Sequence, residues 1–201
     1  MSVYSIKRMK FILREPLQYG ISDAANEYGK VWPQLIRITD ITPEGCLLSN
    51  EGKFISPEIA EGYLLEAGDI LLARSGSVGR SYIHTNNEKP KAFAGYLIRA
   101  KLAHEVAKKF IWYFFHSHMF WHWIDTISIQ ATIQNVSAEK YSNLEIPLPP
   151  LEEQREIAGF LDRETTKIAQ QISLLTEIRE RFSEKRAALI TAAVTGQIAV
   201  S

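Results

Sequence analysis

The sequence predicts an α+β protein, with a mixed α/β domain over residues 1–146 followed by one long helical region over residues 147–201. Two observations support this division. Short apolar runs separated by glycine, proline and asparagine fill the first region, and most are too short for long helices. In the second region, apolar residues recur every seven positions behind three prolines. That spacing is typical of a helix that buries one stripe.

The strands are predicted from apolar runs that lie between turn residues. Residues 31–41 alternate well enough for a strand after Pro33, whereas glycines and prolines keep residues 42–67 irregular. From residue 69 onward the pattern predicts a hairpin and one further strand: strand 69–74, turn 75–79, return strand 80–84 and strand 93–99.

A helical pattern follows from residue 104 to residue 125, with aromatic and aliphatic residues available for burial. Residues 126–140 are expected to form a polar connection, and residues 141–148 a last strand or extended link. Within the connection, Asn135 or Ser137 is placed to cap a short helix at 138–142.

The C-terminal helix is the strongest single prediction. Pro147, Pro149 and Pro150 cannot lie inside a helix, so they form a stiff joint before it, and Gly196 supplies a left-handed stop. About 45 residues at roughly 1.5 Å each give a helix of about 65 Å. Its apolar seam needs a partner helix, and the polar positions three residues further on favour an antiparallel coiled coil. The residues expected in the dimer contact are the seam itself, with Ile172 beside it: Leu161, Ile168, Ile172, Leu175, Phe182 and Leu189.

Composition places the chain among soluble proteins. The chain has 201 residues, of which 46% are hydrophobic, and its single cysteine, Cys46, excludes an internal disulfide. The first ten residues lack the apolar core of a signal peptide, and the most apolar run, 110–124, is shorter than a bilayer and holds three histidines. A cytoplasmic protein without a membrane span is therefore expected.

The distribution of charge is more informative than the net charge of zero. Residues 70–101 carry six lysines and arginines against one acidic residue, Glu88. A protein that is neutral overall can still present one positive face to phosphates. The alternative is a solvated hairpin with scattered cations.

The glycines in Gly76-Ser-Val-Gly79 have two interpretations. The motif lies between two predicted strands rather than before a helix, so it is neither a P-loop nor a dinucleotide fingerprint. A tight hairpin that needs positive φ explains it structurally. The functional interpretation adds a phosphate or base-edge contact from the side chains around it, which are Arg74, Ser75, Ser77 and Arg80.

The polar segment 128–135 has a composition suited to reading bases in the major groove. Glutamine and asparagine can bind adenine bidentately, and threonine can contact the thymine methyl group. The candidate readers are Gln130, Thr132 and Gln134. The alternative is that this segment only leads into a helix cap.

Several patterns that resemble catalytic or metal sites are set aside. His118 and His122 are one helical turn apart, but Met119 occupies the place of a zincin glutamate and no third ligand is evident. The Pro149-Pro150 pair lacks the polar and aromatic neighbours of a nucleotide methyltransferase motif, and no catalytic triad stands out. The sequence therefore indicates a chain without catalytic or metal-binding residues of its own.

A family resemblance is carried by residues from both regions. Leu144-Glu-Ile-Pro-Leu-Pro-Pro-Leu-Glu-Glu-Gln-Arg-Glu-Ile157 and Glu184-Lys-Arg-Ala-Ala-Leu-Ile-Thr-Ala-Ala-Val-Thr-Gly-Gln-Ile198 resemble the conserved region of type I restriction–modification specificity subunits. Residues 33–41 and 68–79 resemble parts of that family's target recognition domains. The family usually carries two recognition domains and two conserved helical regions per chain, whereas this sequence has one of each.

The resemblance implies a half-length, non-catalytic specificity subunit that recognises double-stranded DNA. Base reading is expected around 74–91 and 128–135, and the phosphate anchors would be Lys30, Arg74, Arg80, Lys89 and Lys91. The implied partners are a methylation subunit that holds S-adenosylmethionine and a restriction subunit that hydrolyses ATP. Those cofactors belong to the partners, and none is expected in this chain.

The single recognition domain and the unpartnered seam together predict a homodimer through the C-terminal helices. A two-fold dimer with identical domains would read a bipartite palindromic site. The rival hypothesis is a coiled-coil adaptor that binds protein and never DNA, with the aromatic helix at 104–125 as an exposed docking face.

Overall fold

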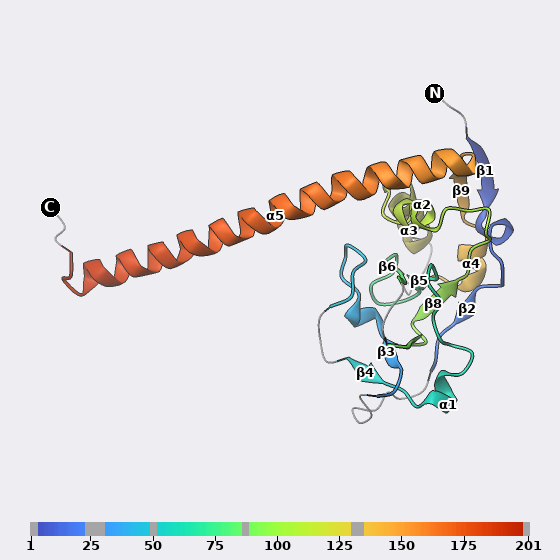
Figure 1. Cartoon of the computed structure of the whole chain (residues 1–201), viewed down its shortest axis with the longest axis horizontal. Helices are drawn as coiled ribbons and strands as arrows, with labels where there is room; N and C mark the ends of the chain where they lie inside the picture. Colours follow the sequence, from blue (N-terminus) through green and yellow to red (C-terminus); the bar gives the residue numbers. More distant parts are fainter. Residues whose placement is uncertain (1–3, 23–30, 49–51, 86–88, 130–134, 199–201) are drawn as a thin grey trace. The chain divides into compact units, whose positions relative to one another are not determined.

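The computed structural model describes residues 4–22, 31–48, 52–85, 89–129 and 135–198 (Figure 1). It has two compact units, Met1–Ala158 and Gly159–Ser201. The first unit is a mixed α/β domain, and a long C-terminal helix, α5 (Leu151–Val194), leads out of it into the second. The mixed class and the long helix were both predicted from the sequence, and both are confirmed.

An antiparallel sheet of four strands lies at the centre of the first unit. Its order is β2 (Gln18–Tyr19), β8 (Leu97–Ala100), β5 (Ile70–Ala73) and β6 (Ser81–Ile83). Leu71 of β5 lies opposite Arg99 of β8 and Tyr82 of β6. All four residues of β5 are buried, because alternate side chains enter two different cores. The predicted hairpin at 69–84 is thus confirmed.

Two smaller sheets flank this one. The first has the order β4 (Lys53–Phe54), β3 (Gln34–Ile36) and β7 (Lys91–Phe93), with β3 and β7 parallel. The second pairs β1 (Ser5–Arg8) with β9 (Glu145–Leu148). Short helical turns lie between the strands: η1 (Met9–Phe11), η2 (Ile38–Asp40) and α1 (Pro57–Ala60).

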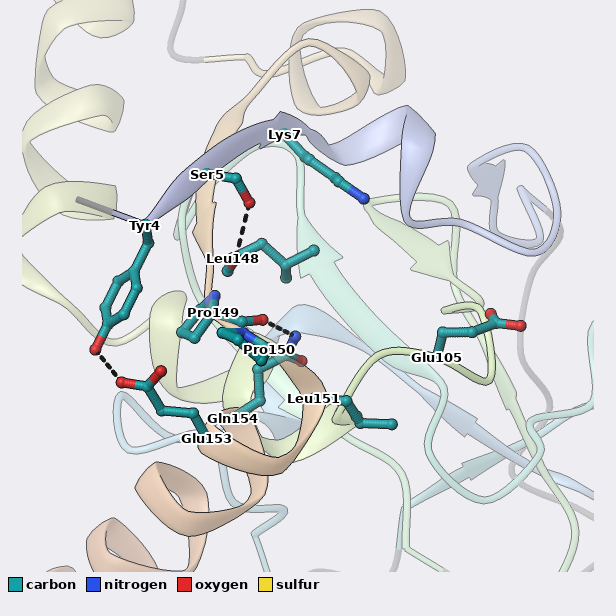
Figure 2. A pocket seen from close by; sticks show the side chains of 10 residues that line it. All are labelled: Tyr4, Ser5, Lys7, Glu105, Leu148, Pro149, Pro150, Leu151, Glu153 and Gln154. Atoms are coloured by element: carbon teal, nitrogen blue, oxygen red, sulfur yellow. Dashed lines mark hydrogen bonds between the residues drawn. The ribbon is translucent and has the colours of Figure 1, made fainter. Parts of the chain in front are cut away.

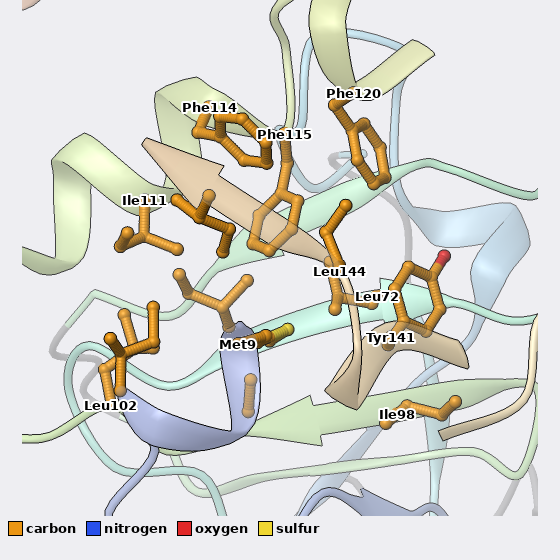
Figure 3. Packing of buried hydrophobic residues seen from close by; sticks show 14 of the residues in the cluster. Met9, Leu72, Ile98, Leu102, Ile111, Phe114, Phe115, Phe120, Tyr141 and Leu144 are labelled. Atoms are coloured by element: carbon orange, nitrogen blue, oxygen red, sulfur yellow. The ribbon is translucent and has the colours of Figure 1, made fainter. Parts of the chain in front are cut away.

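Three helices cover one face of the central sheet: α2 (Lys108–Phe114), α3 (His118–Ile129) and α4 (Ala138–Ser142). Phe115 and Phe120 are fully buried and pack edge to face, 5.1 Å apart between ring centroids. Figure 3 shows them gathered with Leu144 and Tyr141 over Leu72 of β5. Most of the aromatic side chains that an adaptor would need on its surface therefore pack in or against this core, while Trp121 is 38% exposed.

The single helix predicted at 104–125 is wrong, because the chain breaks between α2 and α3. The last turn of α2 tightens, with the Ser117 N–H donating to the Phe114 carbonyl at 3.0 Å. The Ser117 hydroxyl then accepts from the Phe120 N–H at 3.4 Å and starts α3. Serine side chains compete for backbone donors in this way, which favours a helix start. The predicted polar connection also begins later, because α3 continues to Ile129.

Two strand predictions need correction as well. The strand expected at 93–99 is two strands, β7 and β8, joined by a turn in which the Leu97 N–H donates to the Ala94 carbonyl at 2.9 Å. The strand expected at 31–41 ends at Ile36. Beyond it, the Asp40 carboxylate accepts from the Arg37 N–H at 2.9 Å and folds the chain into η2. The described parts of segment 42–67, which are 42–48 and 52–67, are mostly irregular, with β4 and α1 as their short regular pieces.

The proline joint fixes the first turns of α5 to the α/β domain. Gln154 is 1% exposed, and its Oε1 accepts from the Ala107 N–H at 2.9 Å while its Nε2 donates to the Pro149 carbonyl at 2.7 Å. Figure 2 shows the bond from Gln154 to the Pro149 carbonyl, the hydrogen bond from Tyr4 to Glu153 and the open pocket that the prolines help to line. Because this buried side-chain amide satisfies two backbone groups, it fixes the first turn of α5 in one position on the domain.

The far end of α5 is a Schellman motif. Gly196 has φ +72°, its N–H donates to the Ala193 carbonyl at 3.2 Å, and the Gln197 N–H donates to the Ala192 carbonyl at 2.8 Å. The predicted glycine stop is confirmed, and the helix has 44 residues. No helix in the described part of the chain is both long and apolar enough to cross a membrane.

Candidate functional site

The hairpin between β5 and β6 provides the first part of the site. Gly76 and Gly79 both have positive φ, at +74° and +86°. A Cβ on Gly79 would lie 2.8 Å from the Trp121 ring of α3, whereas one on Gly76 would meet only Ile38 at 3.8 Å. Gly79 is therefore required for packing as well as for conformation, while Gly76 is required for the turn alone. The hairpin tip is held on α3 by this close approach.

The second predicted reading segment, residues 128–135, ends beside this hairpin. Ser75 and Asn135 form an antiparallel bridge, and the Val136 N–H donates to the Arg74 carbonyl at 2.8 Å. Tyr141 of α4 fixes the same strand end, because its hydroxyl donates to the Ala73 carbonyl at 2.8 Å. Burial raises the pKa of Tyr141, so this hydroxyl remains a donor. The structure thus brings together two segments about 60 residues apart.

Tyr19 of β2 belongs to the same surface, although nothing in the sequence singled it out. The Arg74 guanidinium lies 4.6 Å from the centroid of the Tyr19 ring. The Tyr19 hydroxyl accepts from the Ala138 N–H at 2.9 Å, beside Ser137, whose hydroxyl accepts from the Lys140 N–H at 3.2 Å. Ser137 is the predicted cap of α4, and the short helix at 138–142 is confirmed.

The remaining predicted phosphate anchors differ in their exposure to solvent and in whether they already bond to the domain. Arg80 is half-buried and donates from Nη1 to the Ile41 carbonyl at 2.9 Å, so part of its guanidinium is already used. Lys89 is exposed. Lys91 is half-buried, and burial lowers the pKa of its ammonium group. Ser75 and Ser77 are half-buried on the hairpin. Four other candidates lie outside the described residues: Lys30, Gln130, Thr132 and Gln134.

Part of the basic excess at 70–101 is neutralised inside the domain. Arg99 is 6% exposed and donates to the Leu64 carbonyl at 2.8 Å, with the Asp69 carboxylate 4.0 Å away. Lys101 is 9% exposed and its Nζ lies 2.6 Å from the Glu66 carboxylate. These two cations brace the end of β8 against the loop that leads into β5. Among the described residues of this cluster, the cations left for a ligand are therefore Arg74, Lys89, Lys91 and part of Arg80.

The seam of α5 lies open to solvent. Leu161 is half-buried, whereas the other predicted contact residues are more than half exposed. Their exposed fractions are 53% for Ile168, 59% for Ile172, 63% for Leu175, 66% for Phe182 and 60% for Leu189. Ion pairs such as Lys167–Glu164 and Arg181–Glu177 decorate the helix. An apolar stripe of this length on an otherwise polar helix is typical of a helix with a partner.

The histidines of α3 do not gain partners suited to a metal. The rings of His118 and His122 stack with centroids 6.3 Å apart, and both side chains are exposed. Among the residues that the structure describes, no three His, Cys, Asp or Glu side chains lie close enough to hold a metal ion.

Comparison with known proteins places this architecture in a family. A family model described as the type I restriction modification DNA specificity domain matches residues 23–179, which include the hairpin, the segment at 135–137 and the first half of α5. The chain belongs to the type I restriction–modification DNA specificity family. The resemblance seen in the sequence is thereby confirmed.

Members of the specificity family are also found among curated proteins and solved structures. The EcoKI specificity subunit of Escherichia coli K12 is 30% identical over 157 residues, covering 75% of this chain and 31% of its own length. A chain of a type I restriction–modification system, studied for complex assembly and conformational transition, superposes with a TM-score of 0.75 at 17% identity, covering 96% of this chain and 46% of its own. The HsdS subunit of Thermoanaerobacter tengcongensis gives 0.61 at 17% identity, covering 84% of this chain and 39% of its own.

These structural matches, at 17% identity, establish a shared fold. The chain spans about a third of the length of the curated relative named above and less than half of each of these structural relatives.

Proposed function

We propose that this chain is the sequence-specific DNA recognition subunit of a type I restriction–modification system and has no catalytic role of its own. The family match over residues 23–179 carries the proposal, because it runs through both the α/β domain and the long helix. The curated relative is itself a specificity subunit. DNA recognition is therefore assigned to the α/β domain, and spacing and assembly to α5.

The DNA-binding surface that we propose is the end of the central sheet where the hairpin meets residues 135–137. Three backbone segments converge there, since Arg74 is bonded to both Tyr96 and Val136. Arg80 would contribute its remaining nitrogens to the phosphates there. Lys91, whose carbonyl accepts from the Leu65 N–H, and the exposed Lys89 near it in sequence are proposed as phosphate anchors further along the domain, toward the opposite end of the hairpin. Lys30, Gln130, Thr132 and Gln134 remain predictions for the same surface.

The partners that we propose are double-stranded DNA, a methylation subunit and a restriction subunit. S-adenosylmethionine and ATP would bind to those subunits, and this chain would bring them to the target. The EcoKI relative, a specificity subunit of a type I restriction enzyme, supports this assignment.

We further propose a homodimer in which two α5 helices pair as an antiparallel coiled coil. The exposed stripe from Ile168 to Leu189 is the supporting observation, because it leaves large apolar side chains in water. A two-fold axis would make the interface isologous and present two identical recognition domains. The target would then be a short half-site, an unread spacer and the same half-site inverted.

The experiment is to express the chain with its methylation subunit and to map adenine methylation by single-molecule sequencing. The expected result is one bipartite palindromic motif that is lost when the chain is omitted. An asymmetric motif with two unrelated halves would rule out the homodimer as the active reader. Methylation that does not depend on the chain would reject the DNA recognition role itself.

A further inference from the structure

Arg74 differs from the other cations around the hairpin in what holds it. Arg99, Lys101 and Arg80 are all bonded to carboxylates or carbonyls of the domain. Within the described residues, the Arg74 side chain has no hydrogen bond or ion pair, and its guanidinium rests 4.6 Å from the Tyr19 ring centroid. A guanidinium stacked on an aromatic face keeps its hydrogen-bond donors unused.

The burial of the Arg74 Nε atom limits which nitrogens of the guanidinium a ligand can contact. Nε is buried and has no hydrogen-bond partner. A ligand can therefore approach only the terminal nitrogens, Nη1 and Nη2, which lie in one plane and can donate two parallel hydrogen bonds. A buried donor without a partner costs free energy, and such exceptions in a folded domain need an explanation.

The position of Arg74 is fixed from several sides. Its N–H donates to the Tyr96 carbonyl at 2.9 Å, and its carbonyl accepts from the Val136 N–H at 2.8 Å. Tyr19 is held in turn through its hydroxyl, which accepts from the Ala138 N–H at 2.9 Å. The cation is thus preorganised, and little side-chain entropy remains to be lost on binding.

We propose that Arg74 reads a guanine in the target, donating from Nη1 and Nη2 to O6 and N7 in the major groove, and that Tyr19 is its positioning residue. This inference rests on the proposed DNA recognition role. A paired, planar donor set matches a guanine edge, whereas a phosphate is satisfied by a flexible point charge such as Lys89. Arg74 is therefore a base reader, rather than one of the phosphate anchors expected from charge alone.

The test compares variants of the full chain, bound to its methylation subunit, in selections from a randomised duplex library. The wild-type protein should select a motif that contains a G·C pair at the Arg74 position. Arg74→Lys keeps the charge but loses the fork, so that single position should become degenerate while the rest of the motif persists. Affinity for the wild-type motif should fall roughly 5- to 150-fold, the range for a lost bidentate base contact.

Two Tyr19 variants separate positioning from folding. Tyr19→Phe keeps the ring beneath the guanidinium and should retain the guanine preference, even if the lost hydroxyl contact lowers stability. Tyr19→Leu removes the aromatic face and should loosen the same position as Arg74→Lys. Lys89→Ala is the matched control, because a lost phosphate contact weakens all sequences alike and lowers the salt slope by about one unit.

Each result decides the proposal. Uniform weakening of all sequences by Arg74→Lys or Arg74→Ala would make Arg74 a phosphate anchor and overturn the inference. Degeneracy at an A·T position would overturn it too. If the wild-type complex selects no motif, the proposed function fails first, whereas a wild-type motif that Arg74→Lys leaves unchanged overturns only the assignment of Arg74.

Discussion

Single residues in this domain are constrained by backbone conformation and by burial, and the two hairpin glycines show the difference. Both have positive φ, but only Gly79 lies against another element, with the Trp121 ring where a Cβ would be. A Cβ on Gly76 would make only an ordinary van der Waals contact with Ile38, at 3.8 Å. The two positions therefore form a matched pair for separating backbone strain from packing.

Gly76→Ala is expected to destabilise the domain by about 1–2 kcal/mol, the cost of a left-handed alanine. Gly79→Ala adds a steric conflict with Trp121 and should cost roughly 2–5 kcal/mol in total. Urea unfolding of both variants measures the difference. Equal losses would mean that α3 moves away without cost and that the hairpin is not held by Trp121.

His84 makes stability depend on pH. The side chain is 5% exposed, with its Nδ1 3.2 Å from the Tyr82 hydroxyl. Burial, and secondly the charge of Lys91, lowers the pKa of His84 from 6.5 to about 4. The unfolded chain thus binds this proton more readily than the folded one. Stability should fall as pH drops below the unfolded value and level off below the folded one.

Between about pH 7 and about pH 5 the loss from His84 should be about 2 kcal/mol. The measurement is urea unfolding at both pH values for the wild-type chain and for His84→Gln. The variant removes this titration but keeps other groups, including the half-buried His116, whose pKa burial also lowers. The same pH dependence in both proteins would show that His84 is not the responsible group.

Helices and strands could be predicted from the sequence where the residues of the element itself determine its structure. The hairpin at 69–84 and the stop at Gly196 need only an apolar run and glycines with positive φ, and both were predicted. The break between α2 and α3 at Ser117 was not predicted. The aromatic pattern continues across it, and a single side chain, the Ser117 hydroxyl, marks the start of α3. The turn at 94–96 depends on which sheet each strand joins, which is a long-range choice.

The candidate site was predictable only in part for the same reason. The positive charge of Arg74 beside a glycine turn, and the glutamine, threonine and asparagine residues of 128–135, were enough to predict both as candidates from the sequence. Their contact through Ser75 and Asn135, and the role of Tyr19, arise from pairings between distant strands. Sequence reasoning also counted Arg99 and Lys101 as surface charge, because their acidic partners are more than 25 residues away.

The stripe on α5 yields a prediction about assembly. Leu175→Asp would place an unpaired charge in the coiled-coil interface and should convert a dimer to a monomer at micromolar concentration. Ser173→Asp introduces the same charge about 200° around the helix, at roughly 100° per residue, and should leave the dimer intact. Light scattering on the three proteins decides between them. A monomeric wild-type chain would contradict the coiled-coil proposal.

For the whole molecule, the length of α5 should determine the distance between half-sites. Removing seven residues between Leu161 and Leu189 keeps the stripe nearly in phase and shortens the helix by about 10 Å. The half-sites should stay the same while the preferred spacer shortens by about three base pairs, at roughly 3.4 Å each. Methylation mapping with the deletion variant measures both.

A five-residue deletion is the control for this experiment. It rotates the stripe by about 140°, at roughly 100° per residue, and should abolish the dimer instead of giving a shorter spacer. An unchanged spacer in the seven-residue variant would show that α5 does not set the separation.

The pairing of β1 with β9 has a consequence for how the protein is made. Ser5 bonds to Leu148, 143 residues later, and all four residues of β1 are exposed in the finished domain. At about 5–20 residues per second, β1 emerges from the ribosome roughly 7–28 s before its partner strand exists. Unpaired strand edges invite association with other nascent chains, and charged side chains oppose it. Lys7 and Arg8 supply such charges on β1 while it has no partner strand.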